Sequence, residues 1–172
     1  MVKTSLSQVT LADVAVEGET ESELRAYIAV GRAVIIWSNL EQNFGNLVAR
    51  LYYSHGGAAL HKEPLFGLKR KIEFWNECFR KLPALAPHQR AALAFSRGLV
   101  EAKGQRDVLL HFAWDASDTV MGLKGRGTRA DSKGRVQATM DLPLGAINGL
   151  AMRAIHLNLR LLPLVMALGR KR

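Results

Sequence analysis

The sequence predicts an all-α fold, a bundle of four to five helices with a small β-hairpin insertion near residues 119–142. Three observations predict it. Apolar residues recur every three or four positions in long segments, glycine and proline separate these segments, and one glycine-punctuated stretch alternates instead. A chain of 172 residues suits a single domain. We expect that domain over residues 21–172, behind a flexible arm at residues 1–20.

The first helix is expected over residues 21–55, beginning with a capping box in which Thr20 and Glu23 cap each other. Positions three and four apart form its predicted buried stripe: Tyr27, Val30, Val34, Trp37, Glu41, Phe44, Val48, Leu51 and His55. Only Glu41 and His55 are not apolar, and a buried Glu41 needs a partner. Because residues 26–37 are apolar on nearly all sides, we expect this half of the helix to be central in the bundle.

Three more helices are expected, over residues 64–82, 88–114 and 143–168. Their predicted core residues are, in order, Leu68, Ile72, Trp75, Phe79 and Leu82; Leu93, Val100, Leu110 and Ala113; and Leu150, Ala154, Leu157 and Leu161. Glycines at 98 and 104 weaken the third helix, which we expect to bend or break near Gly104. In the hairpin, strands at 119–127 and 135–142 would flank a turn at 131–134.

The net charge of +9 is unevenly distributed along the chain. Five acids but a single lysine precede Leu24, so the rest of the chain has 23 bases and 10 acids. A surface of this sign attracts polyanions, either nucleic acid or anionic lipid, although it also serves solubility alone. Five bases lie in the predicted hairpin: Lys124, Arg126, Arg129, Lys133 and Arg135. They would hold an RNA backbone, or they would belong to a solvated loop.

Most familiar enzyme classes lack support in this sequence. Cys78 is the single cysteine, so neither an internal disulfide nor a cysteine-based zinc site is possible. The five histidines do not stand at familiar metal-binding spacings, and we find no Walker loop, dinucleotide fingerprint or Gly-x-Ser-x-Gly elbow. We therefore expect no metal and no cofactor.

The lone thiol and the absence of a secretory signal pattern predict a cytoplasmic protein. The most apolar stretch, residues 142–168, contains Arg153, His156, Arg160 and Pro163. A bilayer-spanning helix has few or no charges, so we interpret this segment as a core helix and expect no membrane association. Arg153, His156 and Arg160 would form a solvated or dimer-facing side of that helix.

One motif carries a specific chemistry, Arg106-Asp107-Val108-Leu109-Leu110-His111. Cleaving RNA without a metal needs an acid and a base, which histidine supplies near neutral pH, and a fixed positive charge on the phosphorane, which arginine supplies. Asp107 and His111 stand four apart and would pair on one helical face. Arg106 lies about 140° around an ideal helix from His111, so one straight helix cannot aim both at one phosphate. Arg50 and His55 have the same spacing, but Leu51 is apolar, and we interpret that match as coincidence.

The motif resembles the Arg-polar-x-x-x-His signature of HEPN domains, small α-helical bundles of prokaryotic toxin and defence systems. The layout of residues 21–168 is similar as well, including Trp37, Leu40 and Glu41 on a long first helix. The resemblance implies a toxin–antitoxin role, with a metal-independent endoribonuclease whose homodimer brings two motifs to one cleft. His111 would be the general acid or base, Arg106 would stabilise the transition state, Asp107 would orient His111, and Glu41 would support them. It also implies RNA as substrate and a neutralising protein partner.

Two alternatives stay open beside the nuclease. The protein would be a non-catalytic HEPN-like module that binds nucleic acid or a protein partner, or a purely structural dimer. In either case Arg106 would simply neutralise Glu41. Phe112 and Trp114 would stack on bases if the protein binds RNA, although aromatic residues beside a helix end more often belong to the core.

Overall fold

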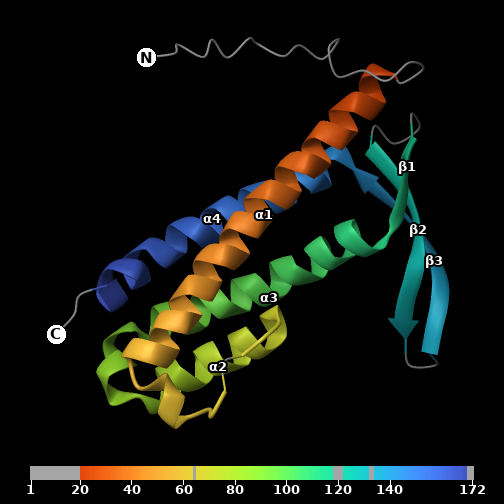
Figure 1. Cartoon of the computed structure of the whole chain (residues 1–172). Coiled ribbons are helices and arrows are strands. Elements are labelled where there is room, and N and C mark those ends of the chain that lie inside the picture. Colours follow the sequence, from red (N-terminus) through yellow and green to blue (C-terminus); the bar gives the residue numbers. More distant parts are fainter. Residues whose placement is uncertain (1–19, 64, 118–121, 132–133, 170–172) are drawn as a thin grey trace, which may run out of the picture.

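The computed structural model describes residues 20–63, 65–117, 122–131 and 134–169. Within them the chain forms four long helices and a small antiparallel sheet (Figure 1). The helices are α1 (Glu21–Ser54), α2 (Leu68–Lys81), α3 (Gln89–His111) and α4 (Leu144–Gly169), and the short turns η2 (Gly57–Ala59) and η3 (Pro83–His88) flank α2. The strands are β1 (Ala113–Ser117), β2 (Gly122–Asp131) and β3 (Gly134–Pro143). The predicted helical bundle with a small β insertion is confirmed; the predicted arm lies outside the described residues, except Thr20.

Both ends of α1 lie within one residue of the predicted bounds. The Glu23 amide donates to Thr20 Oγ1 at 3.3 Å, and the Thr20 amide donates to Glu23 Oε2 at 2.6 Å, which completes the capping box. Gly56 follows the helix with φ +83°, a left-handed conformation that suits glycine. Local chemistry therefore sets the limits of the longest helix.

The buried side of α1 is rotated from the predicted stripe near its N-terminus. Ala26, Ala29 and Ala33 are buried there, whereas Tyr27 is 44% exposed and Ile35 is 63% exposed. The expectation that this half would be central in the bundle is wrong. Small side chains let the neighbouring elements approach closely, and the larger apolar residues face outward. From Trp37 onward, the stripe is buried as predicted, apart from the part-buried Glu41 and His55.

An aromatic cluster joins α1, α2 and α3. The Phe44 ring contacts Trp75 edge to face at a centroid distance of 5.2 Å, and Trp75 Nε1 donates to the Ala92 carbonyl at 3.0 Å. The core stripe of α2 is confirmed at Ile72, Trp75 and Phe79. In α3 the prediction is wrong, since Val100 and Leu110 are exposed. The buried positions are Ala92, Phe95, Ser96, Leu99, Ala102 and Leu109, and the helix continues through Gly104 without a break.

The insertion is a three-stranded sheet in the order β1–β2–β3, rather than a two-stranded hairpin. The third helix ends at His111, and the next residues form β1, which pairs with Gly122–Arg126 of β2. Trp114 lies opposite Gly125, and the Phe112 ring covers Gly127, where an added Cβ would approach within 2.7 Å. Aromatic rings packed against strand glycines explain why the chain leaves the helix here. The predicted turn is partly outside the described residues.

Helix α4 packs one face against α1 and α3 and leaves another face exposed. Leu150, Ala154, Leu157 and Leu161 are buried as predicted. By length and composition α4 would suffice to cross a membrane, a test that core helices of soluble proteins also pass. Only 33% of its most apolar window is buried. The exposed large apolar residues of α4 are Met152, Leu159, Leu162, Val165 and Met166.

Alanine at Gly127 should destabilise the protein by about 1–3 kcal/mol, because the new Cβ would overlap the Phe112 ring. Gly31 of α1 is the matched control, since no atom lies within 4 Å of a Cβ there. Gly31→Ala should stabilise the protein by about 0.5–1 kcal/mol through helix propensity. Urea unfolding of both variants measures the difference. Equal effects would contradict the packing of Phe112 on Gly127.

Candidate functional site

Arg106 of α3 is held between two carboxylates. Its Nη2 donates to Glu41 Oε1 of α1 at 2.7 Å, and its Nη1 donates to Asp107 Oδ1 at 2.8 Å. Trp37 Nε1 donates to the same Glu41 oxygen at 2.6 Å, and the guanidinium carbon lies 5.8 Å from the centre of the Trp37 ring. Arg106 Nε is buried without a partner among the described residues. The side chains of Arg106 and Glu41 are only 21% and 30% exposed, so this is a shielded ion pair.

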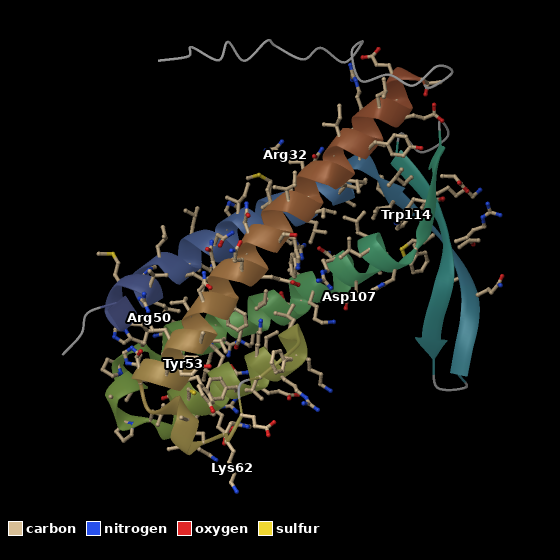
Figure 2. The ribbon with its side chains drawn as sticks, viewed as in Figure 1. Arg32, Arg50, Tyr53, Lys62, Asp107 and Trp114 are labelled. Carbon is tan, nitrogen blue, oxygen red and sulfur yellow. The ribbon has the colours of Figure 1, made fainter. Side chains whose placement is uncertain are left out.

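Asp107 completes the cluster with a second base. Lys103, one turn earlier on α3, donates to Asp107 Oδ2. Partial burial raises the pKa of the Asp107 carboxyl, but the hydrogen bonds from Lys103 and Arg106 outweigh that effect, so its pKa is below the ordinary value. Figure 2 shows Asp107 on α3 and Trp114 between the end of α3 and the sheet. Lys103 lacked any motif signal, although its spacing of four from Asp107 fits a helical ion pair.

His111 lies outside this cluster. It is the last residue of α3 and is exposed. The expected pair between Asp107 and His111 is not formed: the Asp107 oxygens accept hydrogen bonds from Arg106 and Lys103. Asp107 therefore orients Arg106 rather than His111.

The arrangement favours a structural role for Arg106 within one chain. Its two terminal nitrogens each donate to a carboxylate, so a phosphate would have to compete with Glu41 and Asp107 for the guanidinium. Removing the guanidinium would leave Glu41 on the inner side of α1 with only the Trp37 donor. The predicted partnership of Arg106 and Glu41 is confirmed, and its immediate effect is to join α1 to α3.

Four of the five predicted basic residues lie on β2 and β3, and Lys133 is outside the described residues. Lys124 and Arg126 are exposed, and Arg126 Nη2 contacts Asp115 Oδ2 at 3.1 Å, an exposed pair that stabilises little. The side chains of Arg129, Lys133 and Arg135 lie outside the described set. In the ladder, Arg129 pairs with Val136, and Arg135 pairs with Ala130.

Phe112 and Trp114 have structural partners. Their rings stack on each other at 5.6 Å and cover Gly127 and Gly125, while Trp114 Nε1 donates to the Leu109 carbonyl at 2.8 Å. These contacts favour the core interpretation over base stacking. The second Arg-x4-His match is engaged as well, since His55 Nε2 lies 3.0 Å from the Leu168 carbonyl oxygen.

The remaining titratable groups singled out by the sequence lie outside the Arg106 cluster. No three histidine, cysteine or carboxylate side chains there are grouped so as to hold a metal. Burial raises the pKa of the Cys78 thiol to about 12, so this cysteine stays protonated at neutral pH. Arg153, His156 and Arg160 are exposed on α4, as the sequence predicted.

No family model, curated protein or solved structure matches the chain. The resemblance to HEPN domains therefore depends on the six-residue motif and the helix layout alone, and it stays a hypothesis.

Methionine at Arg106 should lower the free energy of unfolding by about 1–3 kcal/mol, because it leaves Glu41 without its cation. Glu41→Gln in the same chain should recover part of this loss. Arg25→Met is the matched control, since its pair with Glu21 is exposed, and it should cost under about 0.5 kcal/mol. Denaturant unfolding of Arg106→Met, Glu41→Gln, their double variant and Arg25→Met forms the test; additive effects of Glu41→Gln and Arg106→Met would contradict direct coupling.

Asp107 should stabilise the fold near neutral pH, and this stabilisation should be lost in acid. Because its folded pKa is lowered, its contribution is complete above the ordinary aspartate value, about 3.9, and decreases as the pH falls through the folded pKa. The stability gap between wild type and Asp107→Asn should therefore be constant above about pH 5 and close below pH 4. Thermal unfolding from pH 2 to 7 measures it. A stability difference between wild type and Asp107→Asn that increases in acid would contradict a lowered pKa of Asp107 in the folded protein.

Proposed function

We propose that the protein is a non-catalytic helical module that binds the phosphate backbone of nucleic acid, with RNA as the first ligand to test. The observation that carries this proposal is the β2–β3 ribbon. Among the described residues, β1 pairs with Gly122–Arg126, so the far parts of β2 and β3 pair there only with each other. In Figure 1 this end of the ribbon extends away from the helices.

The charge of the ribbon suits a polyanion. Residues 122–143 contain five bases and two acids, and a two-stranded ribbon is slender enough to lie along a groove or a phosphate backbone. Lys124 and Arg126 are exposed at its base. Helix α4 adds Arg153 and Arg160 to the surface and contains no acid. Salt-dependent contacts to phosphates are the interaction that such a surface supports.

A HEPN-type endoribonuclease is the second candidate, favoured by the position of His111. The imidazole is exposed and adjoins Phe112, whose ring lies on Gly127 of the ribbon. RNA bound along the ribbon would therefore lie near His111, which could act as a general acid or base. This candidate requires Arg106 to leave its carboxylates or requires another base to stabilise the transition state. The toxin role and the neutralising protein partner depend on this second candidate.

A homodimer would bury the exposed face of α4. Its apolar residues Met152, Ile155, Leu159, Leu162 and Met166 are spaced by three and four, the seam pattern of a helix that packs against another helix. We propose a two-fold pairing of α4 with α4 of a second copy. Cytoplasmic location accords with this proposal, because pairing would remove apolar surface from water.

Charge reversal on the ribbon should weaken RNA binding at least tenfold. The triple variant Arg126→Glu, Arg129→Glu, Arg135→Glu should also bind with a shallower dependence on salt, since fewer phosphates are neutralised. Lys69→Glu, Arg70→Glu, Arg80→Glu on α2 makes the same charge change elsewhere and should have a smaller effect. Fluorescence anisotropy with single-stranded RNA, duplex RNA and duplex DNA gives the affinities. Equal losses in both triple variants would exclude a ribbon-specific site.

Incubation of RNA with the protein in EDTA separates the two candidates. The binding module leaves a broad panel of RNAs intact. The nuclease cleaves them and loses its activity in His111→Ala but not in His156→Ala, an exposed histidine of α4. Absence of cleavage by the wild type ends the nuclease candidate while leaving the binding proposal to the anisotropy measurement.

A further inference from the structure

A cavity of about 710 Å³ lies where the second half of α3, the end of β3 and the start of α4 meet. Its volume is within the range of small-molecule sites. Its walls are mainly apolar, from Val108, Leu109, Met140, Leu142, Ile147 and Leu150. None of the motif residues Arg106, Asp107 and His111 lines it, so the cavity is distinct from the candidate site.

Three glycines keep this cavity open. Gly104 of α3 and Gly145 and Gly149 of α4 all line it, and a Cβ added at any of them would have no atom within 4 Å. Neither a left-handed backbone nor a tight contact requires glycine at these positions. Glycine inside a helix is costly compared with alanine. Gly104 and Gly149 therefore weaken their helices without improving the packing of this chain. Their common effect is to leave space in the wall of the cavity.

The electrostatics of the cavity favour an anion. Arg153 is its one charged lining residue, and it forms no ion pair with any described residue. Gly145 and Ala146 are in the first turn of α4, where backbone amides lack partners within the helix and the helix dipole is positive. No acidic side chain lines the cavity. A ligand here would need an apolar body and a negative head.

We propose that this cavity binds a small amphipathic anion, such as a medium-chain fatty acid, with its chain among the apolar walls and its carboxylate on Arg153. Burial of the chain supplies most of the binding free energy, and the guanidinium supplies a charge-assisted hydrogen bond and selects for anions. The proposal goes beyond nucleic-acid binding, since it uses neither the bases of the ribbon nor Arg106, Asp107 or His111; it shares only Arg153 with the basic surface described above.

Isothermal titration with decanoate, below its micelle concentration, tests the proposal on the full chain. Wild type should bind decanoate, and it should bind decanol at least about tenfold more weakly. Arg153→Gln should lose this preference for the acid and still bind decanol. Gly149→Leu should abolish binding of both, because the side chain fills the cavity, whereas Gly31→Leu, also at an open helical position, should bind like wild type.

Circular dichroism verifies that each variant is folded, and Gly149→Ala, a smaller filling, should give an intermediate loss if Gly149→Leu fails to fold. Three results would overturn the proposal: no binding of decanoate by the wild type, equal binding of acid and alcohol, or unchanged binding in the folded Gly149 variants. RNA affinity should be the same in Gly149→Leu and wild type, which separates this proposal from the proposed function.

Discussion

A carboxylate on the inner side of α1 constrains the way the helices meet. Glu41 stands between apolar neighbours in the buried stripe of α1, and a shielded carboxylate without a partner is strongly destabilising. Arg106 supplies the cation and Trp37 a second hydrogen bond, so the register of α3 against α1 is defined by polar contacts as well as by packing. Asp107 and Lys103 extend the same network along α3. The segment that leads into the sheet is thereby held by charge.

This network also limits the chemistry of the motif. Moving the Arg106 guanidinium away from its two carboxylates would cost free energy, because both ion pairs would be broken. His111, at the end of the same helix, is exposed and is paired with neither carboxylate. The residues most suggestive of catalysis thus divide into a structural pair and a solvent-facing imidazole. The surfaces left for ligands lie elsewhere, on the ribbon, on the outer face of α4 and in the cavity beside Arg153.

Sequence patterns predicted the elements with strong periodicity and failed where small or ambiguous residues decide. The predicted core stripes were correct at Ile72, Trp75 and Phe79 of α2 and at the four predicted positions of α4. In α3, small residues share the core with Phe95, Leu99 and Leu109 while Val100 and Leu110 face water, so hydrophobicity alone misidentified the buried side. β1 was missed because Ala113 and Trp114 fit a helix as well as a strand. Pairing of this segment with β2, where Trp114 lies opposite Gly125, makes it a strand.

The sequence by itself determined what depends on near neighbours: the capping box at Thr20, the approximate positions of the helices and the excess of positive charge. It also indicated that Glu41 needed a partner. Only the tertiary structure decided that Arg106 pairs with Glu41 and that the rings of Trp114 and Phe112 cover Gly125 and Gly127. It alone also decided that three separate glycines border one cavity. Those outcomes depend on contacts between residues distant in the chain, whose energies no local spacing encodes.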